Sequence, residues 1–359
     1  MKILDWYIIK KFLGTFFYSI ALLIVVVIVF DISEKIETFI SHQAPLHAII
    51  FDYYLNFIPY FINLFIYLFT FISVIFFTSR LAGNTEIISM LSSGISFRRL
   101  LRPYLLAALF LAILSFYMGN FLIPKTNHKL RIFMNTYVEN LTRDSEKNIH
   151  VQLSPGTFAY VESYNVERRT GFRFSLEKYD HLKLVYKLNA RKIVMDTAKR
   201  KWVISDYYIR TVDSLGKQHL EKGYAKDTTL ALKPTDLYKI KQHYEEMNFF
   251  VLNDYIKKEK EKGSLAYKKY EIEKNKRLAG PAAILILTLM GVALTSRKVR
   301  GGIGLHLGLG ITLAFSYILL MQISTVFSTL GNLSPALGAW IPNFIYLIIA
   351  LYLLKKAPK

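Results

Sequence analysis

Long apolar runs are the feature of this 359-residue sequence that most restricts its fold. A helix needs about 20 predominantly apolar residues to cross the hydrocarbon core of a bilayer. Runs of this kind lie at about residues 12–30, 51–78, 100–123, 278–295, 303–327 and 336–354. The sequence therefore predicts an α-helical membrane protein with about six transmembrane helices, three before and three after a long polar insert.

The composition indicates a mixed protein, part membrane and part aqueous. Hydrophobic residues make up 53% of the chain, which is high for a soluble domain, and charged residues make up 20%, which is high for a bare helical bundle. Trp6, Tyr7, Lys10 and Lys11 precede the first run and are typical of a membrane interface. No small-residue cleavage site follows that run, so we expect a retained helix.

Basic residues predict the topology, because cytoplasmic loops of membrane proteins carry an excess of Lys and Arg. They gather at both termini and in the connections between the second and third and the fourth and fifth runs: Lys2, Lys10, Lys11, Arg80, Arg98, Arg99, Arg102, Arg297, Lys298, Arg300, Lys355, Lys356 and Lys359. Both termini are expected in the cytoplasm and the insert outside it. These boundary residues, with an affinity for anionic lipid, explain the net charge of +20 more simply than nucleic acid binding.

The insert, residues 125–276, has the pattern of an all-β domain with helical flanks. Short alternating segments such as TFAYVESY and KWVISDYYIRTV are separated by turn signals. About seven such strands, the last at TTLAL (residues 228–232), predict an antiparallel sandwich or a jelly-roll-like domain. Residues 125–147 and 245–263 are expected to be helical. The predicted division is 1–124 for the first three transmembrane helices, 125–276 for the insert and 277–359 for the last three.

The sequence contains no motif for bond chemistry. A GxxxxGK[ST] phosphate loop, HExxH and GxSxG are all absent, so we predict no catalytic residue and no metal site, and ATP hydrolysis would belong to a partner. The lack of cysteine excludes disulfides and thiolate metal ligands. His42 and His47 share one external connection, where we expect them to be interfacial polar residues.

The connection after the second run, RLAGNTEIISMLSSGISFRRLLRP, predicts a short cytoplasmic helix within residues 84–96. Asn84 or Thr85 suits the N-cap, and Glu86 near the start suits the helix dipole. The apolar face consists of Ile87, Ile88, Met90 and Leu91. The helix is expected to end at Ser92, Ser93 and Gly94, and Ser96 is expected to cap the next helix.

Two roles are open for this short helix. A helix that only lies on a membrane is usually basic on one face and bulky on the other. This one is small and weakly charged, which favours docking into a groove of a cytoplasmic protein. Arg98, Arg99 and Arg102 are then expected to anchor the third transmembrane helix at the inner leaflet.

Two charged groups lie at the predicted outer boundary. Asp31, Glu34 and Lys35 follow the first run, either as a solvated helix end with Lys35 paired to Asp31 or as the polar lip of a cavity that handles an amphiphile. A second group follows the third run and consists of Lys125, Lys129 and Arg131. These bases are either simply solvated or contact a phosphate-bearing headgroup.

The glycine-rich segment GGIGLHLGLG, residues 301–310, opens the fifth run. It does not follow a strand, as a nucleotide-binding fingerprint would. Gly304 and Gly308 have the small-xxx-small spacing that allows transmembrane helices to approach closely. We therefore predict a helix-packing role for these two glycines.

With these features in place, the whole chain resembles the LptF/LptG (YjgP/YjgQ) permeases of lipopolysaccharide export. The most specific match is the segment from Glu86 to Ser96, followed by arginines and Pro103. Further matching positions are Asp31, Pro124, Gly280-Pro281 and the basic loop before Gly302. One difference is that some members carry a lysine just before the aspartate, where this chain has Ile28, Val29 and Phe30.

The resemblance implies a transport permease of the Gram-negative inner membrane, not an enzyme, with a periplasmic β-jelly roll. Glu86 matches the acidic residue of the family's coupling helix, so the implied ATPase-coupling residues are Glu86, Ile87, Met90, Leu91, Gly94 and Ser96. Implied lipid-binding residues are Asp31, Glu34, Lys35, Lys125, Lys129 and Arg131. The chain itself would hold no cofactor, with ATP and magnesium in the partner.

The resemblance also implies a set of partners. These are an LptB-like cytoplasmic ABC ATPase dimer, a second permease subunit (paralogue or self), an LptC-like single-helix partner, an LptA-like periplasmic bridge protein and lipopolysaccharide, with no nucleic acid. A membrane-anchored scaffold or binding protein is the alternative, although one helix would suffice for anchoring. An ion-coupled transporter would need ionisable residues within its transmembrane helices, and these runs contain almost none.

Overall fold

A computed structural model describes residues 3–138, 147–165, 168–181, 183–196, 201–213, 216–230, 232, 237, 244–261, 263–264, 266–296 and 302–357. The chain divides into two compact units. A helical unit comprises Met1–Asn140, Tyr244–Asn253 and Lys268–Lys359, and a second unit comprises Leu141–His243 and Asp254–Tyr267. The second unit carries the sheet, so the predicted order of helices, β insert and helices is confirmed.

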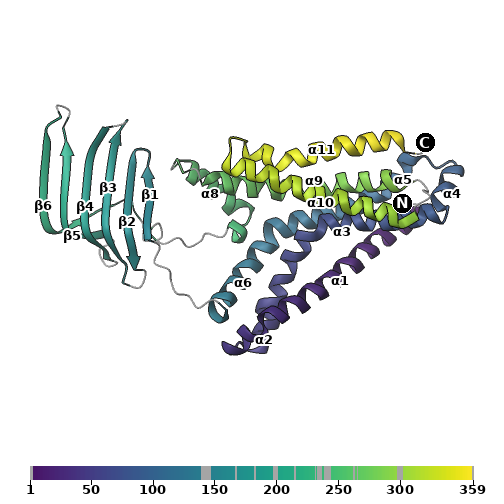
Figure 1. Cartoon of the computed structure of the whole chain (residues 1–359), viewed down its shortest axis with the longest axis horizontal. Coiled ribbons are helices and arrows are strands. Elements are labelled where there is room, and N and C mark those ends of the chain that lie inside the picture. Colours follow the sequence, from purple (N-terminus) through teal and green to yellow (C-terminus); the bar gives the residue numbers. More distant parts are fainter. Residues whose placement is uncertain are drawn as a thin grey trace. The chain divides into compact units, whose positions relative to one another are not determined.

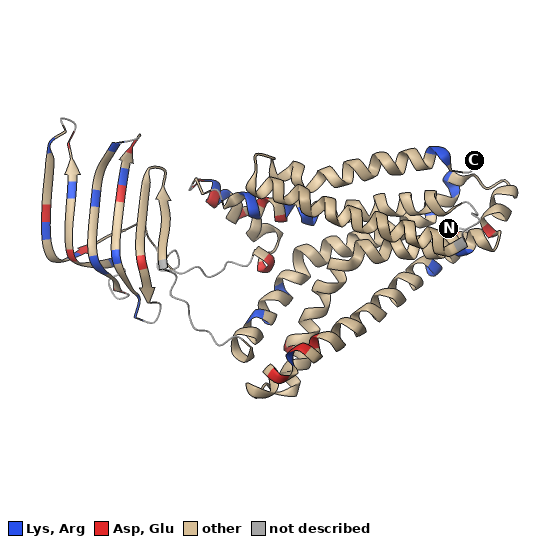
Figure 2. Ribbon diagram, viewed as in Figure 1, with Lys and Arg blue, Asp and Glu red and all other residues tan. Residues whose placement is uncertain are grey.

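Within the described residues, 6 helical segments are long and apolar enough to cross a membrane. They are α1 (Ile3–Ser41), the run of α2 (Leu46–Ala48), η1 (Ile49–Tyr54) and α3 (Leu55–Gly83), the run of α5 (Phe97–Tyr117), η2 (Met118–Leu122) and α6 (Ile123–Tyr137), then α9 (Tyr267–Thr295), α10 (Gly302–Leu330) and α11 (Pro335–Lys356). Charged residues concentrate toward the ends of these helices (Figure 2). The predicted helical membrane protein is confirmed.

The helices extend beyond the predicted apolar runs, because polar helical turns continue them outside the hydrocarbon core. α9 starts at Tyr267 rather than at residue 278. η1 and η2 are π-helical turns within otherwise α-helical runs, and such turns widen a helix locally. The short helix α4 (Glu86–Ser92) and both ends of the chain lie at the same end of this unit (Figure 1). This arrangement agrees with an even number of membrane crossings.

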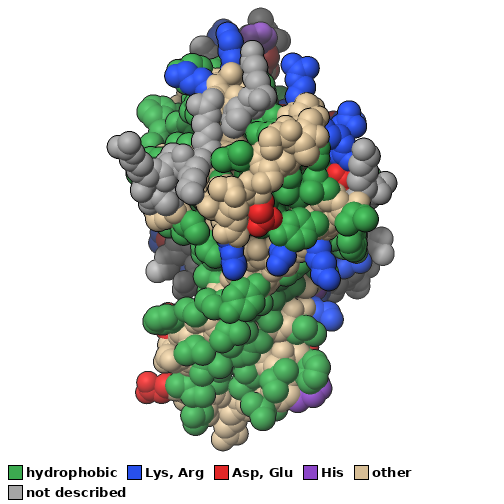
Figure 3. All heavy atoms as spheres, turned by 90° about the vertical axis from the view of Figure 1, so that its right-hand side faces the viewer, with side chains coloured by type: hydrophobic (Ala, Val, Ile, Leu, Met, Phe, Trp, Pro, Cys, Tyr) green, Lys and Arg blue, Asp and Glu red, His purple; other side chains and the backbone are tan. Residues whose placement is uncertain are grey.

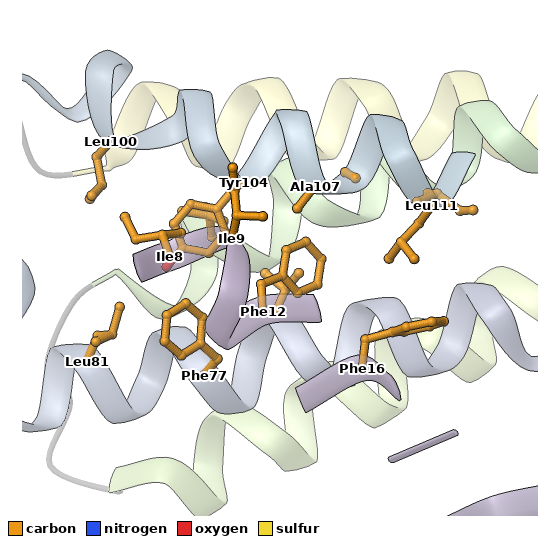
Figure 4. Packing of buried hydrophobic residues seen from close by; sticks show 14 of the residues in the cluster. Ile8, Ile9, Phe12, Phe16, Phe77, Leu81, Leu100, Tyr104, Ala107 and Leu111 are labelled. Atoms are coloured by element: carbon orange, nitrogen blue, oxygen red, sulfur yellow. The ribbon is translucent and has the colours of Figure 1, made fainter. Parts of the chain in front are cut away.

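One cluster of buried apolar side chains in the helical unit joins α1, α3 and α5 and includes Ile87 of α4. Phe12 and Phe16 of α1 are fully buried against Phe77 of α3 and Tyr104 and Leu111 of α5 (Figure 4). Inside a membrane such contacts stabilise by close packing rather than by removal from water. One close approach depends on glycine, since a Cβ at Gly280 of α9 would lie 2.2 Å from the Tyr67 hydroxyl.

The second unit contains a six-stranded antiparallel sheet whose strands follow the chain order. The strands are β1 (Lys147–Ser154), β2 (Thr157–Asn165), β3 (Thr170–Asp180), β4 (Lys183–Asp196), β5 (Lys201–Val212) and β6 (Gln218–Thr228). The predicted all-β insert is confirmed, but its strands differ from the predicted set. The segment 218–228 is a strand that the sequence patterns did not indicate, and the described part of TTLAL after Thr228 is not a strand.

All six strands of the sheet share a transverse row at which the ladder pairs are interrupted. The row consists of Asn148, Glu162, Arg173, Arg191, Asp206 and Tyr224, each skipped in every pairing that its strand makes. Arg173 and Asp206 have φ angles of 51° and 50°, which lie in the left-handed region. A left-handed residue breaks the alternation of side-chain direction, so the row marks a crease.

The crease explains why one face of strands β2 to β5 stays buried and apolar on both sides of the row. Buried residues stand three positions apart across the row, not two: Val161 and Tyr164, Gly171 and Phe174, Ala190 and Ile193, Ile204 and Tyr207. With strict alternation, one half of the sheet would expose its apolar side chains. Among the described strands, this creased meander takes the place of the predicted jelly-roll connections.

Candidate coupling and lipid-binding sites

The local structure around α4 differs from the prediction at its start and matches it at its end. Thr85 occupies the N-cap position with φ 61°, and its side chain does not cap the helix but donates to the Asn84 carbonyl at 2.6 Å. Gly94 adopts φ 86°, and Gly94 N–H and Ile95 N–H donate to the carbonyls of Leu91 and Met90. This is a Schellman motif, which ends the helix as predicted. Ser96 accepts from Arg99 N–H at 3.3 Å, as predicted for the next cap.

The apolar residues of α4 divide between two faces. Ile87 is 0% exposed and belongs to the core of the helical unit, and Met90 and Leu91 pack against that core. Ile88 is 53% exposed and points away from the core. Three of the residues predicted to dock to a partner therefore pack α4 against other helices of its own chain. The free apolar contact is Ile88, which the helical period of the sequence places on a different side from Ile87.

Glu86 is the acidic residue of this helix, and its carboxylate is already oriented. The Tyr7 hydroxyl of α1 donates to Glu86 Oε2 at 3.2 Å, and Asn84 Nδ2 donates to Glu86 Oε1 at 3.2 Å. Figure 3 views this end of the bundle and shows an acidic side chain among a few basic ones. A carboxylate in the first turn also interacts favourably with the helix dipole. The side chain is half-buried and remains accessible to a partner.

Polar contacts join the segments on either side of α4 to three other helices. Arg99 Nη2 lies 2.7 Å from the buried Asp5 carboxylate of α1. Before α4, Ser79 Oγ lies 2.8 Å from His306 Nδ1 of α10. The Thr78 hydroxyl donates to the Tyr104 hydroxyl of α5 at 3.1 Å. A displacement of α4 would therefore reach α1, α5 and α10 through directional contacts.

The three arginines that were predicted to anchor the third transmembrane helix have different surroundings. Arg99 is held by Asp5, whereas Arg98 and Arg102 are exposed. Of the three arginines, only these two are free to contact headgroups. The other basic loop, with Arg297, Lys298 and Arg300, lies outside the described residues, as do Lys2 and Lys359.

In the last third of α1, Asp31 is buried in a network of hydrogen bonds. Lys35 Nζ lies 2.6 Å from Asp31 Oδ1, and the hydroxyls of Tyr53 and Tyr54 donate to the same carboxylate at 3.0 and 3.1 Å. Lys35 also contacts the Tyr53 hydroxyl. Glu34 is exposed. The expected pair of Lys35 and Asp31 is present, but Asp31 is buried rather than solvated, and the network adds two tyrosines that the sequence patterns did not single out.

The three bases of α6 do not form one cluster. Lys125 and Lys129 are exposed. Arg131 instead binds Glu246 of the 3-10 turn η3 (Tyr244–Glu246), through its Nε and through Nη2 at 3.0 Å from Oε2. His128 Nδ1 lies 2.9 Å from the same carboxylate. Lys125 and Lys129 remain available for an anionic headgroup, whereas Arg131 first has to leave Glu246.

Gly304 and Gly308 lie on an exposed face of α10. A Cβ built at either position would meet no atom within 4 Å, so these glycines do not pack against the described helices of their own chain. The close approach of α10 is at Gly310, where a Cβ would lie 2.1 Å from Ile75 Cδ1 of α3. A packing role for Gly304 and Gly308 would require a helix of another chain.

The helices and sheet define a multi-pass membrane protein with an inserted all-β unit. A family described as lipopolysaccharide export system permease LptF/LptG matches residues 6–356. The chain belongs to this family of permeases, as its resemblance predicted, and is a transport component rather than an enzyme. No curated protein sequence matches the chain.

Proposed function

We propose that this permease extracts lipopolysaccharide from the inner membrane and delivers it to a periplasmic bridge of β-domains, driven by ATP hydrolysis in a cytoplasmic ABC ATPase. α4 would lie in the cytoplasm with both termini, and the sheet would lie in the periplasm. The observation that carries this proposal is that α4 has one buried side and one accessible side. Ile87 is fully buried while Ile88 and Glu86 are accessible, as expected of a helix attached to one chain and docked to another.

The proposed transmission follows the contacts around α4. Nucleotide-driven movement of the ATPase would displace α4, and Tyr7, Asp5 and His306 would pass that displacement to α1 and α10. These two helices have many exposed apolar residues. They suit a lipid-lined or subunit-lined surface, where a second permease and an LptC-like helix would bind.

The lipid would first meet charged groups at the outer boundary and then the creased sheet. Lys125 and Lys129 are suited to lipid phosphates, because both are exposed basic side chains. Acyl chains would bind along the apolar face of the sheet, with Val161, Phe174 and Ile204, once the side chains that bury this face move aside. In this proposal the LptA-like bridge protein receives the lipid from that face.

Glu86 provides the direct test. The variants Glu86→Ala and Glu86→Lys should weaken association with the ATPase or uncouple its hydrolysis from lipid export. The measurements are co-purification of the full-length chain with the co-expressed ATPase, ATPase activity in liposomes and lipid release. Ser92→Ala, a change in an exposed residue of the same helix, is the control. Unchanged association, hydrolysis and export in both Glu86 variants would contradict the proposed role.

Co-purification also separates the alternative of a membrane-anchored scaffold. A bound ATPase and a second permease would support transport. A stable complex with external proteins alone would support scaffolding. Mass spectrometry of bound protein and lipid distinguishes the two.

A further inference from the structure

A groove between α9 and α10, with a volume of about 280 Å³, has no role in the proposed transport path. Its walls come from α9, from the last turns of α10 and from Tyr244 of η3. All of these residues belong to the helical unit. The groove lies apart in sequence from the bases of α6 and from the charged group on α1.

Two lysines give the groove its charge. Lys269 and Lys276 of α9 both line it, and they stand seven residues apart, on one face of the helix. Lys269 Nζ lies 5.2 Å from the centroid of the Tyr244 ring, a cation–π contact that positions the ammonium without neutralising it. Among the described residues, neither lysine makes an ion pair with a carboxylate.

The one carboxylate in the groove is engaged elsewhere. Glu273 Oε1 lies 3.0 Å from Arg277 Nε, and that arginine side chain is only 6% exposed. The other guanidinium nitrogens of Arg277 donate to the carbonyls of Met247 at 2.6 Å and Tyr244 at 2.8 Å. Glu245 lies across Tyr244 in an adjoining hollow, which Lys276 also borders. The positive charge of the groove is therefore incompletely compensated.

The wall that α10 contributes has a polar part and an apolar part. Gln322, Thr325 and Thr329 of α10 face the lysines, and the hydroxyls of both threonines donate to backbone carbonyls of their own helix. The Gln322 amide is therefore the side chain on this wall best able to donate to a ligand. Val326 and Leu330 continue the wall as an exposed apolar surface, being 45% and 84% exposed.

The groove lies at the membrane depth expected for lipid headgroups. The apolar run of α9 begins at about residue 278 and that of α10 ends at about residue 327, so Lys276 stands at the edge of the hydrocarbon core. Lysines at this depth extend their ammonium groups toward lipid phosphates. An apolar surface beside them is the place for an acyl chain.

We propose that this groove binds the phosphate headgroup of an anionic glycerophospholipid, held by Lys269 and Lys276, with an acyl chain along Val326 and Leu330. The bound lipid joins α9, α10 and η3 and is resident, distinct from the transported lipopolysaccharide. A phosphate in this groove accepts hydrogen bonds from both ammonium groups. The site requires only that the chain spans a membrane and does not depend on ATPase coupling.

The test measures lipid binding by the full-length protein in mild detergent after delipidation. Phosphatidylglycerol is titrated, and bound lipid is counted by native mass spectrometry while thermal unfolding is followed. Phosphatidylcholine and rough lipopolysaccharide are titrated separately, to distinguish the charge and the source of the phosphate. The variants are Lys269→Ala/Lys276→Ala and the charge-conserving Lys269→Arg/Lys276→Arg.

Lys268→Ala/Lys274→Ala is the matched control, because it removes the same charge from the same turns of α9. Lys268 Nζ donates to the Gly331 carbonyl at 3.3 Å and Lys274 Nζ to Asn253 Oδ1 at 2.6 Å, so neither is free for this groove. Each groove lysine near a membrane surface contributes about fivefold to the affinity for an anionic lipid, so the double alanine variant should bind about 25-fold more weakly.

Wild type, the arginine variant and the control should bind phosphatidylglycerol alike and show the same rise in Tm. The double alanine variant should lose that rise while binding lipopolysaccharide normally. Equal binding of phosphatidylglycerol in all variants would overturn the proposal, and so would binding of phosphatidylcholine with the same affinity. A lysine requirement seen only with lipopolysaccharide would assign the groove to the transported lipid instead and would also overturn it.

Discussion

The guanidinium of Arg99, near the start of α5, lies 2.7 Å from the carboxylate of Asp5, near the start of α1. The carboxylate is buried, so removal of the Arg99 guanidinium takes a charge-assisted hydrogen bond out of the protein interior. Arg99→Ala should lower the free energy of unfolding by about 1–3 kcal/mol, measured for the full-length protein in detergent.

The neighbouring arginines provide the comparison for this first prediction. Arg98→Ala and Arg102→Ala remove exposed side chains and should change the stability by less than about 0.5 kcal/mol. A loss of stability of similar size in all three variants would show that the contact with Asp5 contributes nothing specific.

Substitutions at Ile87 and Ile88 should distinguish packing within the chain from docking to the ATPase. Ile87→Ala removes a fully buried side chain and should destabilise the protein by about 2–4 kcal/mol. Ile88→Asp changes an exposed side chain, so it should leave the Tm of the isolated chain unchanged while reducing retention of the ATPase on an affinity column. Normal retention of the ATPase by Ile88→Asp would exclude this residue from the contact.

Alanine substitutions at Asp31 and Glu34 should differ in their effect on stability, although the two residues lie only three positions apart. Asp31→Ala removes the carboxylate to which Lys35 and two tyrosine hydroxyls donate and should cost about 1–3 kcal/mol of stability. Glu34→Ala should leave the stability within about 0.5 kcal/mol of wild type, since the side chain is exposed. Chemical denaturation of both variants measures the difference. Equal stabilities would argue against a structural role for the Asp31 network.

The loss of stability caused by Gly280→Ala should be smaller when Tyr67, the side chain that the new Cβ meets, is changed to Phe. The new Cβ would lie 2.2 Å from the Tyr67 hydroxyl, which forces a shift and should cost about 1–3 kcal/mol. In a Tyr67→Phe background the nearest remaining atom is Cζ at 3.0 Å, so the same substitution should cost less. A double-mutant cycle on thermal unfolding reports this coupling. The control is Gly304→Ala, which meets open space.

The sheet contains an ion pair with a defined pH dependence. Lys187 Nζ lies 2.8 Å from Glu177 Oε1, and its hydrogen bond lowers the pKa of Glu177, with help from the Tyr179 hydroxyl. Because the folded pKa is depressed, the stabilisation is present above the unfolded pKa of about 4.3 and is lost as the pH falls through the folded pKa. The stability difference between wild type and Lys187→Gln should therefore shrink between pH 7 and pH 3. A pH-independent difference would assign the effect to packing.

The sequence predicted the helices well because apolar runs of about 20 residues have few alternatives. It predicted the end of α4 from Gly94 and the cap at Ser96, both of which act through adjacent backbone groups. It missed β6 because that strand, Gln218–Thr228, is polar and largely exposed, so its hydrogen bonds rather than its side chains define it.

The candidate site was harder to predict because its contacts join distant segments. Tyr53 and Tyr54 reach Asp31 from 22 and 23 residues away, and Glu246 reaches Arg131 from 115 residues away. Nothing in the local pattern indicates such pairs. Charge alone therefore suggested a phosphate contact for Arg131, whereas the fold places a carboxylate beside it.

The position of Lys35 on the same helix as Asp31 has a consequence for biosynthesis. α1 precedes η1 in the chain, so Asp31 reaches the bilayer before Tyr53 and Tyr54 do. Lys35 follows one helical turn later and forms its 2.6 Å contact within the helix itself. The aspartate can therefore enter the membrane boundary as half of a neutral pair, and the tyrosines complete its coordination once the second helix has inserted.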